Sequence, residues 1–219
     1  MTTEKIELRP AFLTLGKNLV SEIIGFYPLL SNGGQPKLVI GVAGESGSGK
    51  SVTAQALKHV LAEAGIKSAV LSIDNYFKLA PKQNDLARRQ NIDQVGPSEV
   101  RLALLQAHLF AFVAGHTAIV VPVTDYAKDR FEREVIDLED VDVLIVEGTY
   151  VYMLDGIDRL VFLDHTYKDT HAQRLARNRD KMDAFVEEVL EIEHKIISEG
   201  RQKADFRITT DYQVNFVQR

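Results

Sequence analysis

The feature that most constrains the fold is an octet of the form G-x-x-x-x-G-K-S, which begins at Gly44 and ends at Ser51. It directly follows an apolar run at residues 38–43. Glycines let the backbone of such a loop curl so that successive N–H groups point at phosphate oxygens. The positive end of a following helix points at the same anion. Strand, loop and helix together predict a binding loop for the phosphates of a nucleoside triphosphate.

Two side chains at the end of the octet have predicted roles of their own. Lys50 places a positive charge near the β and γ phosphates, and the Ser51 hydroxyl can bind Mg²⁺. We therefore expect Mg²⁺ beside the nucleotide. The residues expected to contact the nucleotide are the octet and the residue after it: Gly44, Glu45, Ser46, Gly47, Ser48, Gly49, Lys50, Ser51 and Val52.

Length and composition exclude several classes of protein. The 219 residues, 45% of them hydrophobic and 26% charged, suit one soluble globular domain. A net charge of −5 without a long basic run makes a nucleic-acid partner unexpected. The chain has no cysteine, so it has no disulfide or thiolate metal site. It also lacks a signal-peptide pattern and any apolar stretch near the ~18 residues that span a bilayer, so we expect a cytoplasmic protein without a membrane partner.

Strands and helices alternate along the chain. Residues 1–36 are expected to form an N-terminal extension, with an amphipathic helix at 10–27 and a linker after it. Apolar runs predict strands at residues 37–43, 68–73, 118–123, 141–146 and 160–163, with short strands at 205–209 and 212–217. This order predicts an α/β fold in which a mostly parallel five-stranded sheet has helices on both faces. Ligands then bind at the carboxyl ends of the strands.

The remaining segments are predicted from their caps and their polarity. Residues 75–97 are polar without clear periodicity, which is typical of a substrate-side insertion. Ser98 is expected to cap an apolar helix that ends near residue 114, and another helix should begin near Lys168. Asp183 is expected to cap a helix that ends at Gly200.

Acidic residues follow two of the predicted strands. Asp74 follows the strand at 68–73, where a carboxylate can accept a proton from a substrate hydroxyl or hold a metal ion through water. Glu147 ends the strand at 141–146 and occupies the usual position of a second carboxylate on the metal side. Taken alone, Asp74 is more typical of a helix cap or turn residue, and Glu147 alone is compatible with a cap. Together with Ser51, Asp74 and Glu147 are the predicted metal-site residues.

Positive charges gather between two predicted helices, in residues 174–184. They are Arg174, Arg177, Arg179 and Lys181. Arginines there can close over a transferring phosphoryl group as a lid. The same spacing is compatible with a solvated helix face.

The ordered set of segments resembles the uridine kinase/phosphoribulokinase family over residues 38–208. The matching segments are Ile40 to Ser51, Ser72-Ile-Asp74-Asn-Tyr76-Phe, Asn91-Ile-Asp93, Pro122-Val-Thr-Asp125-Tyr, Val146-Glu147-Gly148 and Lys203-Ala204-Asp205. This resemblance implies a P-loop NTPase fold and a kinase that transfers the γ-phosphoryl group of ATP to a hydroxyl of a small molecule. It implies catalytic roles for Lys50, Asp74, Arg177 and Arg179, and acceptor contacts from Tyr76, Asp93, Asp125 and Arg174.

The chain departs from that family where the acceptor binds. Uridine kinases hold the pyrimidine with a tyrosine and a histidine, whereas this chain has Thr124 and no histidine in residues 117–164. The insertion instead carries Lys78, Lys82, Arg88 and Arg89, which suit an acceptor with a phosphate or carboxylate, or form a solvated face. These departures favour a sugar, sugar acid or related alcohol, with uridine or cytidine as the alternative acceptor.

A second class of function stays open at this point, a nucleotide-dependent switch or regulatory ATPase. The guanine-recognition pattern N-K-x-D and the pattern D-x-x-G are absent from usable positions, which disfavours a GTPase. A kinase-like protein without activity is a third reading, and the acidic residues and Lys50 argue against it. The preference for ATP or GTP and the formation of a homo-oligomer are not determined by the sequence.

Overall fold

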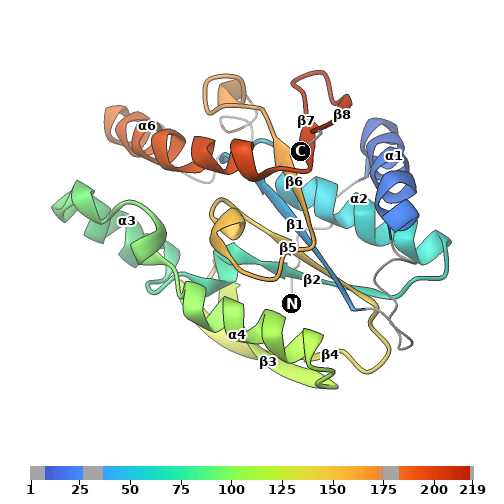
Figure 1. Cartoon of the computed structure of the whole chain (residues 1–219). Coiled ribbons are helices and arrows are strands. Elements are labelled where there is room, and N and C mark those ends of the chain that lie inside the picture. Colours follow the sequence, from blue (N-terminus) through green and yellow to red (C-terminus); the bar gives the residue numbers. More distant parts are fainter. Residues whose placement is uncertain (1–7, 27–36, 173, 175–182, 218–219) are drawn as a thin grey trace.

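A six-stranded sheet forms the centre of the molecule, in the strand order β2-β5-β1-β6-β7-β8 (Figure 1). Its strands are β1 (Leu38–Gly44), β2 (Ser68–Ser72), β5 (Val143–Glu147), β6 (Arg159–Leu163), β7 (Phe206–Ile208) and β8 (Val214–Phe216). The first five in the sheet order run parallel, and only β8 is antiparallel. This is a computed structural model, and it describes residues 8–26, 37–172, 174 and 183–217.

Helices cover both faces of the sheet, as predicted. Helices α1 (Pro10–Phe26) and α2 (Lys50–Glu63) pack on one face, in a cluster that includes Ile40 and Val42 of β1. Helix α4 (Leu102–Val113) packs on the other face, in a cluster that includes Val39 and Ala43. Alternate residues of one buried strand therefore contribute to two hydrophobic cores. In the described parts of the chain, no helix is both long and apolar enough to cross a membrane.

The placement predicted for residues 118–123 is wrong, because this strand is not part of the main sheet. It is β3 (Ala118–Asp125), which pairs antiparallel with β4 (Arg130–Asp137) in a separate two-stranded sheet. Along β3, Ile119, Val121 and Pro122 are buried, whereas Ala118 and Val120 are exposed. The prediction failed because the charged, mostly exposed sequence of β4 gave no sign of a strand.

The predicted insertion at residues 75–97 is largely helical. It contains the end of the 3₁₀ helix η2 (Ile73–Tyr76), helix α3 (Pro81–Gln90) and the 3₁₀ turn η3 (Ile92–Gln94). The capping role predicted for Ser98 is wrong: Pro97–Glu99 form their own 3₁₀ turn, η4, and α4 begins only after Arg101. The break lies at Val100, which has an extended backbone (φ −106°, ψ 144°) and forms an isolated β-bridge with Phe77.

The C-terminal elements follow the predictions closely. Asp183 caps α6 (Ala184–Ile197) by accepting the N–H of Val186 at 3.0 Å. A 3₁₀ helix, η6 (Ser198–Lys203), and the strands β7 and β8 follow. The 3₁₀ helix η5 is formed by Val151–Met153. The turn 167–170 precedes helical backbone that begins at His171, whereas the sequence predicted a helix from near Lys168. The predicted linker at 28–36 and most of the predicted lid, 175–182, lie outside the described residues.

Candidate nucleotide and phosphoryl-transfer site

The predicted phosphate loop connects β1 to α2 and depends on its glycines. Gly47 and Gly49 have positive φ angles of 80° and 101°, which favour glycine. A Cβ atom on Gly47 would lie 3.1 Å from side-chain atoms of Thr170 and Arg174, so the loop is closely enclosed. The hydroxyl of Ser48 is buried in the loop without a hydrogen-bond partner among the described residues. A curled loop with a buried, unpaired hydroxyl fits the binding of phosphate oxygens.

Lys50 and Ser51 begin α2 and point to different parts of the site. The Lys50 ammonium donates to the backbone carbonyl of Glu45 at 2.7 Å, across the loop. The Ser51 hydroxyl donates to Oε1 of Glu147 at 3.2 Å. The parallel register explains this second contact, because Glu147 lies opposite Val42 of β1 and Ser72 of β2. The carboxyl ends of three strands therefore meet where the sequence predicted them to meet.

Two carboxylates share this edge of the sheet. Burial raises the pKa of Glu147 above its ordinary value, and the nearby Asp74 carboxylate raises it further, while Lys50 and hydrogen bonds from Ser72 and Ser51 oppose the shift. Asp74 itself is exposed on η2. Two carboxylates and a hydroxyl oxygen around one space are the hard oxygen ligands that Mg²⁺ prefers. Glu147, Asp74 and Ser51 are thus the described residues that fit a magnesium ion.

Neighbouring elements fix the position of η2 and hence of Asp74. A Cβ atom on Gly148 would lie 1.9 Å from Cγ2 of Ile73, so only glycine lets the end of β5 approach η2 this closely. From β3, Thr124 donates its backbone N–H to Oδ1 of Asn75 at 2.9 Å and its hydroxyl to the carbonyl of Asp74 at 3.1 Å. The backbone that carries Asp74 is therefore held from both sides.

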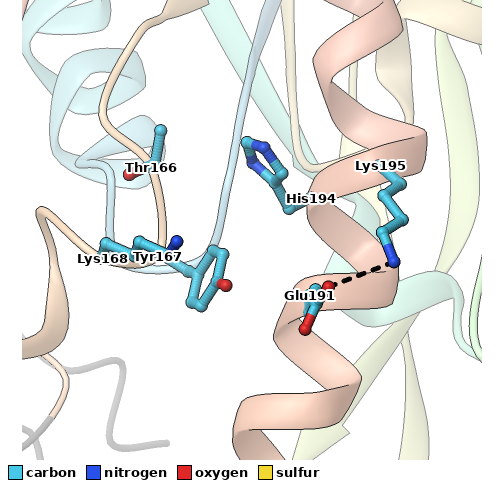
Figure 2. A pocket seen from close by; sticks show the side chains of 6 residues that line it. All are labelled: Thr166, Tyr167, Lys168, Glu191, His194 and Lys195. Carbon is cyan, nitrogen blue, oxygen red and sulfur yellow. Dashed lines mark ion pairs between the residues drawn. The ribbon is translucent and has the colours of Figure 1, made fainter.

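Glu45 of the phosphate loop has partners that the sequence did not reveal. Its Oε2 accepts the N–H of Tyr167 at 2.6 Å, and Nδ1 of His194 on α6 lies 2.6 Å from its Oε1. A pocket of about 290 Å³ is lined by residues of the segment 166–168 and of α6. Tyr167 and His194 are among these lining residues (Figure 2). The other lining residues are Thr166, Lys168, Glu191 and Lys195. Since 149 residues separate Glu45 from His194, no local pattern could have predicted this contact.

The predicted acceptor residues lie in different places. Arg174 packs on the phosphate loop, with its guanidinium 2.9 Å from the Thr170 hydroxyl. Asp125 is the last residue of β3, where hydrogen bonds from Lys128 lower the pKa of its carboxyl. Asp93 is exposed on η3.

Tyr76 lies in the core instead of facing the site. It is 1% exposed, and its hydroxyl oxygen lies 2.8 Å from Nδ1 of His108. Burial raises the pKa of Tyr76. Its side chain cannot touch an acceptor in this conformation, so we remove it from the proposed acceptor contacts. The predicted catalytic residues Arg177 and Arg179 lie outside the described residues.

Arg88 and Arg89, the arginines of the insertion, are engaged by acidic residues of the protein. Arg88 donates to Glu99 at 2.6 Å and to Glu193 of α6 at 2.9 Å, and its side chain is only 15% exposed. Arg89 pairs with Asp85 and Asp183. The predicted pairing of these two arginines with an acidic acceptor is therefore not supported.

Comparisons with known proteins identify the family. Residues 39–199 match the model of the Phosphoribulokinase / Uridine kinase family. The uridine kinase of Leuconostoc citreum is 30% identical over 164 residues, which are 72% of this chain and 76% of the relative. The bifunctional alpha-galactosidase/sucrose kinase AgaSK of Mediterraneibacter gnavus is 29% identical over 189 residues, which are 80% of this chain but only 20% of that protein.

A solved structure shows the same fold at low sequence identity. The D-glycerate 3-kinase of Cryptococcus neoformans var. grubii superposes with a TM-score of 0.62 and 16% identity, covering 93% of this chain and 99% of the other. The phosphate loop, the acidic residues at the strand ends and the family model that matches residues 39–199 lead to one conclusion. The chain belongs to the phosphoribulokinase/uridine kinase family.

Proposed function

We propose that the chain is an ATP-dependent kinase that phosphorylates a hydroxyl of an uncharged sugar or related alcohol. The observation that carries the proposal is the meeting of Lys50, Ser51, Glu147 and Asp74 at the carboxyl ends of β1, β5 and β2. These are the groups that phosphoryl transfer requires: a cation for the phosphates, oxygen ligands for a metal ion and a carboxylate for the hydroxyl.

The described residues have distinct roles in this reaction. The loop amides and Lys50 hold the triphosphate, and Ser51 and Glu147 hold Mg²⁺, which when bound neutralises charge on the β and γ phosphates. Asp74 accepts the proton of the acceptor hydroxyl while the oxygen of that hydroxyl bonds to the γ-phosphorus. The bond from that phosphorus to the β–γ bridging oxygen breaks, and ADP leaves. Arg174, which lies on the loop, supplies positive charge beside the phosphates.

The choice of acceptor rests on charge. Arg88 is held between two carboxylates and Arg89 is paired twice, so neither is available to an anionic acceptor. Lys78 and Lys82 are exposed, which fits the alternative expectation of a solvated face. The relative AgaSK carries sucrose kinase in its name, which also supports a neutral sugar over a sugar acid.

A nucleoside acceptor is the alternative, and Thr124 argues against it. Its hydroxyl and its N–H both donate to η2, so neither group can donate a hydrogen bond to a pyrimidine. A nucleotide switch or regulatory ATPase is the other class of function. Such a protein hydrolyses ATP when no acceptor is present. A kinase should hydrolyse ATP negligibly until an acceptor is present.

The test is coupled ADP release with Mg-ATP across nucleosides, pentoses, hexoses, sugar phosphates, glycerate and pantothenate. We expect one neutral sugar or alcohol to stimulate turnover, and Asp74→Asn to reduce that turnover about 10²–10⁴-fold. Binding of ATP in the absence of Mg²⁺ should stay unchanged in the variant, because Asp74 is placed at the acceptor hydroxyl and the metal ion and not at the loop that holds the phosphates. Turnover without an acceptor, or full activity of Asp74→Asn, would contradict the proposal.

A further inference from the structure

The geometry of the site fixes the direction in which a bound nucleotide lies. The γ end must reach Asp74 and Glu147, at the ends of β2 and β5. These strands lie on one side of β1, and β6 and β7 lie on the other. The nucleoside end of the molecule must therefore leave the phosphate loop toward β6 and β7. This direction depends on the kinase site proposed above.

Three aromatic rings lie on that side of the loop. A Cβ atom on Gly49 would lie 3.4 Å from Cε1 of Phe12 in α1, so the Phe12 ring touches the loop. The ring centroids of Phe12 and Tyr212 are 5.0 Å apart, and those of Tyr212 and His165 are 4.9 Å apart. The rings come from three segments: α1, the stretch after β6, and the turn between β7 and β8.

The cluster has an unused polar atom and an unusual backbone conformation. His165 is 6% exposed, and its Nδ1 has no hydrogen-bond partner in the part of the chain that the structure describes. A buried nitrogen of this kind requires an explanation, and a ligand atom is one. Tyr212 has φ of 62°, in the left-handed region that a tyrosine rarely adopts. Such strain is typical of functional positions.

We propose that Phe12, His165 and Tyr212 form the subsite for the base and ribose of the nucleotide. Tyr212 and Phe12 are both partly exposed and supply aromatic surface for a base, and Nδ1 of His165 supplies a hydrogen bond. The N-terminal helix α1 then belongs to the active site through Phe12, although it precedes the family match at residues 39–199.

The experiment separates contacts to the nucleoside from contacts to the phosphates. Binding of Mg-ATP and of inorganic tripolyphosphate with Mg²⁺ is measured by calorimetry for the whole chain. We expect the wild type to bind ATP more tightly than tripolyphosphate. Tyr212→Gly should weaken ATP binding about tenfold and leave tripolyphosphate binding unchanged. Glycine suits the left-handed conformation at this position, so the turn should keep its shape.

Two further variants make the result specific. Phe12→Leu keeps an apolar side chain against the loop and should also weaken ATP binding alone. Phe216→Ala removes an aromatic ring from the same pair of strands and should change neither affinity, because Phe216 packs on Phe206 instead of facing the loop. His165→Phe keeps a ring and should weaken ATP binding by loss of the hydrogen bond.

Equal loss of ATP and tripolyphosphate binding in Tyr212→Gly would overturn the inference, because it would indicate a purely structural role. Unchanged ATP binding in Tyr212→Gly and Phe12→Leu would also overturn it. In both cases the wild type still binds triphosphate, so the proposed kinase site stands. A wild type that binds neither molecule would overturn the proposed function together with the inference.

Discussion

The nucleotide side and the acceptor side of the site treat their positive charges differently. On the nucleotide side, Lys50 donates to the backbone carbonyl of Glu45 at 2.7 Å and lies near the Glu147 carboxylate, whose raised pKa it opposes. On the acceptor side, Arg88 donates to two carboxylates, Glu99 and Glu193, at 2.6 and 2.9 Å. A phosphate can displace a carbonyl from an ammonium group, but two buried carboxylates hold an arginine in place. Lys50 is therefore suited to bind a phosphate, whereas Arg88 is suited to hold parts of the protein together.

The paired arginines also connect the insertion to the helix that follows the lid region. Arg88 reaches Glu193, and Arg89 reaches Asp183 and stacks 4.5 Å over the ring of Phe185. His194, which directly follows Glu193 in α6, contacts Glu45 of the phosphate loop. Helix α6 therefore touches both sides of the site through adjacent side chains. Arg88 and Arg89, two of the four insertion cations that seem surplus in the sequence, therefore have structural partners in the fold.

The largest effect that would sharpen this comparison is expected from Arg88→Gln. Removing the guanidinium leaves Glu99 and Glu193 buried near each other, which should lower the free energy of unfolding by about 3–5 kcal/mol. Urea unfolding measures the loss. Arg89→Gln is the matched control, since the Arg89 side chain is 36% exposed and solvent screens its ion pairs, so the loss of stability should be much smaller. Equal effects of the two substitutions would show that Arg88 is not the special member of the pair.

On the nucleotide side, Glu147→Gln should raise the free energy of unfolding, by less than Arg88→Gln lowers it. Burial and Asp74 raise the pKa of Glu147 above the ordinary value of 4.5, so the folded protein without ligands loses stability as the pH rises through that raised pKa. Glutamine does not ionise, so the variant does not lose stability in this way. Above the raised pKa its free energy of unfolding should exceed that of the wild type by about 1 kcal/mol, or about 2–4 °C in Tm.

The pH dependence provides the control for that prediction. The advantage of Glu147→Gln should disappear below the ordinary pKa, where the glutamate is protonated in both the folded and the unfolded state. Mg-ATP should stabilise the wild type much more than the variant, because Glu147 is a proposed metal ligand. Thermal unfolding between about pH 4 and pH 8, with and without Mg-ATP, measures both effects. A variant that is less stable than the wild type at every pH would contradict the conclusion that the charged form of Glu147 destabilises the folded protein without ligands.

The nucleotide side could be predicted from the sequence far better than the acceptor side, for a physical reason. The phosphate loop, Asp74 and Glu147 depend on local patterns and on the alignment of parallel strand ends. The pairing of Arg88 with Glu193 joins residues 105 positions apart and involves no local signal. The hairpin of β3 and β4 was missed because one strand of the pair is charged and exposed. Tyr76 matched a family segment, but the pattern does not determine which way its side chain points.

The most direct measurement compares acceptors that differ only in charge. It is the ratio of kcat/KM for a neutral sugar to that for its phosphate or sugar-acid counterpart, with the same hydroxyl available, under saturating Mg-ATP. We predict that the neutral sugar is preferred by about tenfold or more, because the described arginines of the insertion are already paired within the protein. A preference for the anionic acceptor would contradict this account of the acceptor side.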